Sequence, residues 1–284
     1  MTHTRMTRRT ALTTLAGAAI IGRDAAALDA PKINGRLKQS VSRWCYGGMS
    51  LEDLAKHAKA MGLVAIDLLS ENEWKPVQDL GLVCSMANGP STIGDGFNRV
   101  ENHDRMVKEM ERMLPIAKAA GVPNMIVLSG NRRGMSDREG MDNCVKGLKR
   151  IMPAAEQVGI NICMELLNSK RDHKDYMCDH TAWGVEMVKG VGSPRMKLLY
   201  DIYHMQIMEG DVIQTIRDNI QYIGHFHTGG VPGRHEIDDT QELNYATICK
   251  AIVKTGFTGY LAHEFIPTRD PMQSLQQAFT LCDV

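Results

Sequence analysis

The strongest constraint on the fold is a repeated alternation: after about residue 36, short apolar segments and longer amphipathic segments follow one another eight times. Short apolar runs bounded by turn residues are typical of buried parallel strands, and amphipathic stretches between them are typical of crossover helices. Eight such units predict one α/β domain over residues 36–284, a single (β/α)8 or TIM barrel. The expected strands are VSRWCY (41–46), VAIDLL (64–69), LVCSMA (82–87), NMIVLS (124–129), NICMELL (161–167), MKLLYD (196–201), YIGHFH (222–227) and GYLAHEF (259–265).

The helices are expected between these strands. Ser50 should cap the first, which runs to about Met61, because its hydroxyl can accept a hydrogen bond from the first turn. A short or irregular connection is expected after the second strand, and a long loop rich in Gly, Asn and Ser after the third. The other helices are expected at about 101–120, 139–158, 180–190, 209–218, 241–255 and 272–281.

A doubly wound sheet is the main alternative architecture. Such sheets usually carry a Gly-rich phosphate-binding turn after the first strand. The sequence contains neither a GxGxxG motif nor a P-loop, and no linker or shift in composition divides it. The barrel is therefore the favoured fold.

Charge and cysteine content exclude several classes of function. Lys and Arg together number 33, and so do Asp and Glu, so the chain has none of the basic excess that nucleic-acid binding normally requires. The seven Cys form no CxxC pair. Neither a disulfide framework nor a zinc ribbon is therefore indicated, and nucleic acid is not an expected partner.

The first 30 residues have the layout of an export signal. Arg5, Arg8 and Arg9 precede an apolar run at 11–22, and small residues follow. The adjacent arginines resemble a twin-arginine signal, although the usual bulky residue soon after the pair is missing. The apolar run is too short to span a bilayer, so no stable membrane anchor is expected. Residues 1–30 thus predict a periplasmic or otherwise exported protein; if the leader does not function, the protein is cytoplasmic.

Four consecutive expected strands end on side chains that can bind a metal. In (β/α)8 barrels the active site is built at the carboxyl ends of the strands. Taken singly, each side chain has an ordinary alternative, a solvated strand end or a hydrogen-bonded core histidine, but four on successive strands favour a site. Three carboxylates and one imidazole suit one divalent ion, Mn²⁺, Mg²⁺, Co²⁺ or Zn²⁺. The four candidates are Glu165, Asp201, His227 and Glu264.

Longer strings around these positions resemble a known family. The sequence is similar to hydroxypyruvate isomerase and, more broadly, to the xylose-isomerase-like barrels, which include the ketose 3-epimerases. The detailed similarity runs from about residue 160 to 270, and the amino-terminal half matches only in architecture. The segments that carry it are CMELLNSK (163–170), YDIYHMQIMEGD (200–211), GHFHTGGVPGRHE (224–236), ELNY (242–245) and HEFIP (263–267).

The resemblance assigns roles to particular residues. Glu165, Asp201, His227 and Glu264 fall on the four metal-ligand positions of the ketose 3-epimerases, and Glu165 and Glu264 also fall on the paired acid/base carboxylates. His204 and Arg234 fall on substrate-contacting positions. In hydroxypyruvate isomerases the position of His227 is often Gln, so this chain leans toward the epimerase-like metal site, and the exact substrate stays open.

The chemistry of these residues is consistent with an isomerase. Removing a proton beside a carbonyl creates an enediolate, and a divalent cation stabilises that charge. One carboxylate removes the proton, and the other returns it at the neighbouring carbon or on the opposite face. Glu165 and Glu264, expected on opposite sides of the ring, are placed to flank a small hydroxy-carbonyl or sugar substrate. We therefore expect an aldose-ketose isomerase or an epimerase.

Other functions remain open at this stage. A lyase would use the same proton abstraction and then expel a β-hydroxyl or a glycosidic oxygen from an oxidised keto-sugar. A non-catalytic sugar-binding protein belongs to another class, and two opposed carboxylates argue against it. A DNA-repair nuclease would need a richer His/Asp set and a basic face, and neither is evident. The metal identity is open, and so is assembly into a homo-oligomer.

Overall fold

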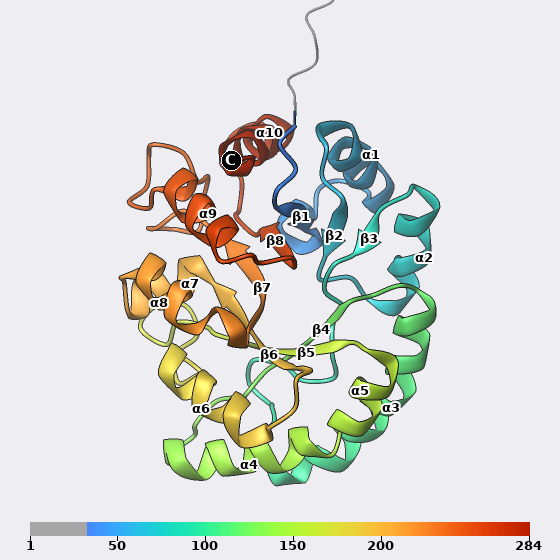
Figure 1. The fold of residues 1–284 in the computed structure, drawn as a ribbon, viewed down its shortest axis with the longest axis vertical. Coiled ribbons are helices and arrows are strands. Elements are labelled where there is room, and N and C mark those ends of the chain that lie inside the picture. Colours follow the sequence, from blue (N-terminus) through green and yellow to red (C-terminus); the bar gives the residue numbers. More distant parts are fainter. Residues whose placement is uncertain (1–32) are drawn as a thin grey trace, which may run out of the picture. The chain divides into compact units, whose positions relative to one another are not determined.

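The computed structural model describes residues 33–284, which form one compact unit, and the expected leader at 1–30 lies outside the described residues. Eight parallel strands form the centre of this unit, and helices surround them (Figure 1). The strands are β1 (Lys38–Ser42), β2 (Ala65–Asp67), β3 (Val83–Cys84), β4 (Asn124–Val127), β5 (Asn161–Glu165), β6 (Met196–Asp201), β7 (Ile223–Thr228) and β8 (Tyr260–His263).

The hydrogen-bonded strand order is β3-β2-β1-β8-β7-β6-β5-β4, so the first and last strands are neighbours. The two ends of this sheet are joined just beyond β3. The backbone N–H of Ala87 donates to the carbonyl of Asn124 at 2.9 Å, and Ala87 accepts from Ile126 at 3.0 Å. These two bonds complete the ring, which confirms the predicted (β/α)8 barrel.

Helices follow each strand in the chain, as the alternation predicts. They are α1 (Leu51–Met61), α2 (Glu71–Asp79), α3 (His103–Ala119), α4 (Asp137–Lys149), α5 (Met152–Val158), α6 (Thr181–Val191), α7 (Ile202–Met208), α8 (Val212–Asn219), α9 (Tyr245–Lys254) and α10 (Pro271–Cys282), with short 3-10 segments η1 (Arg43–Tyr46), η2 (Val100–Asn102) and η3 (Ile220–Tyr222).

The prediction of a short or irregular connection after the second strand was wrong. Helix α2 lies there, and it begins with a capping box. The Ser70 side chain faces the backbone N–H of Glu73, and the Glu73 carboxylate accepts from the backbone N–H of Ser70 at 2.8 Å. This reciprocal pair satisfies two donors that a helix start otherwise leaves free, which explains why so polar a segment is helical.

Two predicted helical regions differ from the structure. The expected helix at 139–158 is α4 followed by α5, because Pro153 lies in the first turn of α5 and supplies no backbone N–H to continue α4. The expected helix near 209–218 is α8, preceded by the unpredicted α7. The Asp201 carboxylate caps α7 by accepting a hydrogen bond from the backbone N–H of His204 at 3.2 Å.

The first strand ends earlier than predicted. β1 ends at Ser42, and the expected strand residues 43–46 form η1 instead. The Arg43 guanidinium donates to the carbonyls of Tyr46 at 2.8 Å and Met49 at 3.0 Å, and these bonds turn the chain back on itself. The turn places Trp44 beside the carboxyl ends of the strands.

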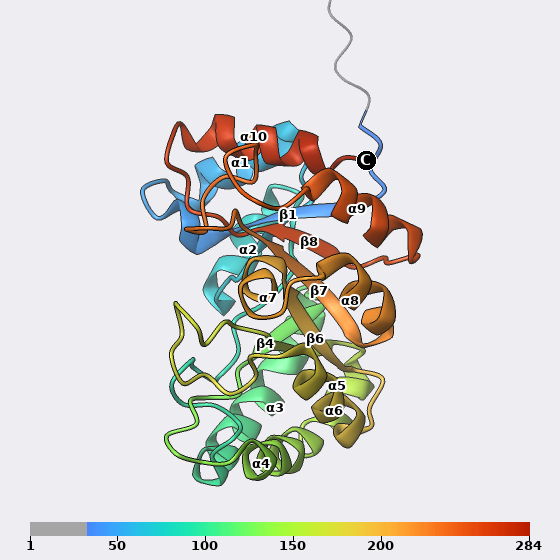
Figure 2. The same cartoon turned by 90° about the vertical axis from the view of Figure 1, so that its left-hand side faces the viewer.

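Long connections lie at the carboxyl end of the barrel. Figure 2 shows the loops at 88–98 and 166–180 on the same side of the barrel. Within residues 33–284, no helix has both the length and the apolar character that crossing a membrane requires. In (β/α)8 barrels the functional site lies at the carboxyl ends of the strands, the end where these long loops also lie.

Candidate active site

The structure brings the four predicted donor residues together. Glu165 ends β5, Asp201 ends β6, His227 is the penultimate residue of β7, and Glu264 directly follows β8. Each offers one ligand atom, and these atoms lie within 4.8 Å of one another. All four side chains are buried, with at most 6% of a residue exposed. Only two strands separate β5 from β8, so the prediction that Glu165 and Glu264 lie on opposite sides of the ring was wrong. Their carboxylates instead converge on one point.

The His227 imidazole lies at the centre of this cluster. Its Nδ1 contacts the Glu264 carboxylate and lies 3.4 Å from Glu165 Oε1 and 3.9 Å from Asp201 Oδ2. No hydrogen bond of acceptable geometry satisfies this buried nitrogen in the described structure. An unsatisfied nitrogen facing three carboxylates is costly without a cation. The donor set therefore fits a divalent metal ion that prefers nitrogen and oxygen ligands.

The ionisable groups of this cluster differ in the direction in which their surroundings shift their pKa values. Burial opposes charge on His227, but the negative charge of Glu264, the hydrogen bond to Asp67 and the close approach of the Glu165 and Glu264 carboxylates raise the pKa of the imidazole well above its usual value. Burial raises the pKa of Asp201, with Glu264 and Glu165 adding to the effect and Arg234 opposing it. Burial acts in the same direction on Glu264, yet Arg234 and His227 lower its pKa. Burial thus dominates at Asp201, whereas the neighbouring positive charges dominate at Glu264.

Arg234 supplies one of those positive charges. Its Nη2 lies 2.7 Å from Asp201 Oδ2 and 2.5 Å from Glu264 Oε2. The Arg234 backbone has a φ of 58°, in the left-handed region that non-glycine residues rarely adopt. Its Nε also donates to the backbone carbonyl of Glu264 at 3.1 Å, so the guanidinium is held against the cluster. The predicted substrate-contacting arginine therefore lies directly beside the predicted ligands.

His204 lies on the other side of Arg234. Its ring is fully buried; burial and the nearby charge of Arg234 hold its pKa well below the usual value, which favours the neutral ring. Nδ1 accepts from the backbone N–H of Asn168 at 3.1 Å, and Nε2 lies 2.6 Å from Arg234 Nη1. A neutral imidazole accepts at only one nitrogen, and both neighbours are donors. One of these two donors, the Asn168 N–H or the Arg234 guanidinium, therefore lacks an acceptor on the ring.

Trp44 was missed as a site residue by the sequence analysis, which placed it inside the first strand. Its Nε1 donates to Glu264 Oε1 at 2.5 Å, and its ring is half exposed. The Arg234 guanidinium lies 5.6 Å from the Trp44 ring and 5.1 Å from the Tyr203 ring, distances typical of cation–π contacts. The available sequence signal was one large aromatic residue beside Arg43 within the predicted first strand.

Asp67 was also missed, although a lone carboxylate in the apolar segment VAIDLL was visible in the sequence. It is the last residue of β2 and is fully buried. Its Oδ2 accepts a hydrogen bond from Nε2 of His227 at 2.8 Å. Nothing in the local sequence indicates that Asp67 reaches β7, so its role was not predictable from the chain around it.

Glu236 joins the loop that carries Arg234 to the loop that follows Glu264. Its carboxylate accepts hydrogen bonds from the backbone N–H of Thr268 at 2.9 Å, the Thr268 hydroxyl at 2.9 Å and the Ser274 hydroxyl at 2.8 Å. Burial would raise the pKa of Glu236, but these hydrogen bonds lower it to about 2. The ionised carboxylate is therefore part of what holds the two loops together.

We expect Glu236→Gln to lower the free energy of unfolding by about 1–3 kcal/mol at neutral pH, because buried donors lose a charged acceptor. A carboxyl group with a lowered folded-state pKa stabilises the fold above its unfolded pKa and loses that effect as the pH falls through its folded pKa. The difference between wild type and variant should therefore shrink between about pH 4.5 and pH 2. Urea denaturation across this range measures it, with the exposed Glu242→Gln as control. Equal stabilities at neutral pH would contradict the prediction.

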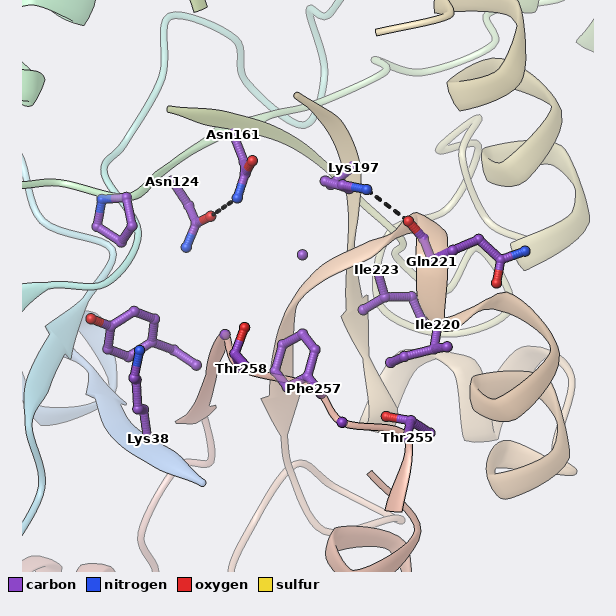
Figure 3. A pocket seen from close by; sticks show the side chains of 15 residues that line it. Lys38, Asn124, Asn161, Lys197, Ile220, Gln221, Ile223, Thr255, Phe257 and Thr258 are labelled. Atoms are coloured by element: carbon purple, nitrogen blue, oxygen red, sulfur yellow. Dashed lines mark hydrogen bonds between the residues drawn. The ribbon is translucent and has the colours of Figure 1, made fainter. Parts of the chain in front are cut away.

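A separate cavity of about 480 Å³ lies at the amino-terminal end of the strands. Its lining includes Lys38, Asn124 and Asn161, which begin β1, β4 and β5 (Figure 3). Asn161 donates to Asn124 at 3.0 Å, and Lys197 donates to the carbonyl of Gln221 at 2.7 Å. Among the described residues, no carboxylate or imidazole lines this cavity. Because its lining residues begin strands, this cavity lies at the opposite end of the barrel from the four donors. It also lacks their carboxylate and imidazole groups.

Comparison with known sequences gives a consistent result. A family model described as xylose isomerase-like TIM barrel matches residues 50–281. A 2-oxo-tetronate isomerase of Cupriavidus necator is 36% identical over 106 residues, which is 37% of this chain and 40% of that protein. A Homo sapiens protein provisionally named hydroxypyruvate isomerase is 30% identical over 112 residues, 39% of this chain and 40% of that protein. The matched segments thus span 40% of the length of these two relatives.

Solved structures of similar fold cover most of the chain. The structure of an AP endonuclease, family 2, from Brucella melitensis has a TM-score of 0.77 at 20% identity and covers 84% of this chain and 96% of that one. A D-psicose 3-epimerase from Clostridium cellulolyticum, solved with D-tagatose, has a TM-score of 0.70 at 16% identity and covers 87% and 97%. At these identities the likeness establishes the fold alone.

Proposed function

The chain belongs to the xylose isomerase-like TIM barrel family, and we propose that it is a metal-dependent isomerase or epimerase that moves a proton beside a carbonyl group. The observation that carries this proposal is the convergence of Glu165, Asp201, His227 and Glu264 at one buried point. Three carboxylates around an unsatisfied imidazole nitrogen are suited to binding a cation. Two of these carboxylates, Glu165 and Glu264, can also act as general bases.

The four converging residues would hold one divalent cation, which, when bound, stabilises negative charge developing on the substrate oxygens as a Lewis acid. Glu165 and Glu264 approach the same point from β5 and from the end of β8. One carboxylate removes a proton from the carbon beside the carbonyl, and the charge of the resulting enediolate resides on its oxygens. The other carboxyl group returns a proton to the neighbouring carbon or to the opposite face.

Arg234 and His204 are proposed to bind the substrate. The two side chains meet at 2.6 Å, although His204 Nδ1 already accepts from Asn168. A substrate oxygen that separates the two side chains would accept from both the guanidinium and the imidazole N–H and remove the conflict. The Arg234 guanidinium also lies 5.6 Å from the Trp44 ring and 5.1 Å from the Tyr203 ring, and stacking on such rings helps to orient its planar fork.

The substrate class is proposed to be a small hydroxy-carbonyl compound, a sugar or a sugar acid. The relatives named above are a 2-oxo-tetronate isomerase and a provisional hydroxypyruvate isomerase. The epimerase named above has the same fold and was solved with D-tagatose. In this chain His227 completes a ligand set that resembles that of the ketose 3-epimerases. Both reactions begin with the same proton abstraction, so they are distinguished by where the proton returns.

Hydrogen exchange from solvent tests this proposal directly. We expect purified protein loaded with Mn²⁺ to introduce deuterium from D₂O at the carbon beside the carbonyl of at least one compound in a panel of hydroxypyruvate, a 2-oxo-tetronate and D-psicose. Exchange at C1 of a ketose would assign aldose-ketose isomerisation, and exchange at C3 with inversion would assign epimerisation. Heat-inactivated protein is the control.

Two other results of this experiment would contradict the proposal. A product that has lost a hydroxyl group or a glycosidic oxygen would assign a lyase instead. Absence of exchange with a broad panel of keto-sugars and keto acids, although the protein binds a cation, would contradict proton transfer as the activity.

A further inference from the structure

Asp67 reaches across the inside of the barrel to His227. It ends β2, and β1 and β8 lie between β2 and β7 in the sheet order. The side chain is fully buried, and its Oδ2 lies 2.8 Å from Nε2 of His227. Burying a carboxylate is expensive unless its oxygens accept hydrogen bonds. The position of Asp67 therefore needs a compensating role or partner.

The other oxygen of Asp67 is also held. The Ser85 hydroxyl donates to Oδ1 at 2.5 Å, and His225 Nε2 lies 3.1 Å from the same atom. Asp67, His225 and His227 offer donor atoms within 4.8 Å of one another, so they resemble a second cation site. However, both Asp67 oxygens already accept hydrogen bonds, one of them from His227 itself. We therefore interpret these contacts as support for His227.

The bond to Asp67 determines which His227 nitrogen is free. Because a carboxylate only accepts, Nε2 of His227 must carry the proton that faces Oδ2. In the neutral imidazole the lone pair is then on Nδ1, the atom that faces Glu165, Asp201 and Glu264. The opposite tautomer would point a lone pair at Asp67 and an N–H at the site where a cation would bind. A carboxylate behind a metal-binding histidine is a common way to set its tautomer and orientation.

We propose that Asp67 is a positioning residue that fixes the tautomer and orientation of His227 for a divalent cation, with Ser85 holding the Asp67 carboxylate in place. This role rests on the proposed function, because it takes His227 as a ligand. It assigns a purpose to a buried charge that contacts no substrate.

Calorimetric titration of metal-stripped protein with Mn²⁺ at a fixed pH measures this role. We expect Asp67→Ala to weaken Mn²⁺ binding by about 10- to 100-fold. Asp67→Asn retains an oxygen that can accept from His227, so we expect a smaller loss and partial rescue relative to Asp67→Ala. Ser42→Ala is the matched control, because Ser42 pairs with Asp67 in the β1–β2 register and its buried hydroxyl has no hydrogen-bond partner in the described structure. It should bind Mn²⁺ like wild type.

Nitrogen NMR of ¹⁵N-histidine-labelled protein gives a readout that a general loss of stability would not produce. In the Zn²⁺-loaded wild type we expect His227 to be protonated at Nε2 and metal-bound at Nδ1, with its signals assigned by their absence in His227→Gln. Asp67→Ala should lose this pattern while circular dichroism shows a folded barrel. If it does not fold, Asp67→Asn carries both measurements.

The outcomes separate this inference from the proposed function. Unchanged Mn²⁺ affinity and an unchanged His227 tautomer in folded Asp67 variants would overturn the positioning role and leave the metal centre intact. A wild-type protein that binds neither Mn²⁺ nor Zn²⁺ would overturn the metal centre itself, and the role of Asp67 with it.

Discussion

Replacing Glu165 or Glu264 with Gln is expected to lower the rate of deuterium exchange by about 10²- to 10⁴-fold, the range typical of general acid–base catalysis. The amide retains the size of the carboxylate but cannot accept a proton. The loss should appear in kcat, because each carboxylate acts on the substrate after it has bound. Removing both should cost little more than removing one, because residues that act as a unit are not additive.

Two controls make this experiment specific. Metal content measured on each variant separates loss of the base from loss of the cation, because both carboxylates are also proposed ligands. Glu186→Gln, which replaces an exposed carboxylate on α6, should retain wild-type exchange. A doubly substituted protein with full activity would rule out the acid/base assignment.

Removal of divalent cations is expected to lower activity by roughly 10³-fold or more, because Lewis-acid stabilisation of an enediolate contributes several kcal/mol to the transition state. Dialysis against a chelator, followed by addition of Mn²⁺, Co²⁺, Mg²⁺ or Zn²⁺ singly, measures the loss and the recovery. The metal-free protein should also unfold at a lower temperature than the loaded protein, because a ligand that binds only the folded state stabilises it.

The recovery series also identifies the preferred ion, which the donor types alone leave open among four metals. Protein dialysed in the same way against buffer without chelator is the control. A preparation free of metal that keeps its full exchange rate would contradict the role given to Glu165, Asp201, His227 and Glu264.

Much of the proposed site was predictable because the barrel turns local pattern into spatial position. A carboxylate near the end of an apolar run, as at Glu165 or Asp201, indicates which end of the strand carries the donor. Parallel strands place all such termini at one end of the barrel. Four donors on successive strands are therefore expected to lie together, and they do.

The parts that were mispredicted depend on specific side-chain bonds. β1 ends at Ser42 because Arg43 bonds to the carbonyls of Tyr46 and Met49, and this turn brings Trp44 to Glu264. The helix after the second strand forms because of the capping box of Ser70. Such bonds involve few residues and leave little trace in hydrophobic periodicity, so pattern analysis placed these boundaries wrongly.

The amino-acid sequence alone therefore determines the barrel, the end of the barrel where the donors lie and the chemical types of those donors. All three follow from hydrophobic periodicity and from the residues at the strand ends. Only the folded ring shows that Asp67 meets His227, a residue 160 positions away, and that Arg234 lies between His204 and the carboxylates. These contacts span the barrel interior, and their geometry depends on how the strands close and stagger. Local sequence carries no information about that distance, which is why the contact between Asp67 and His227 appears only in the tertiary structure.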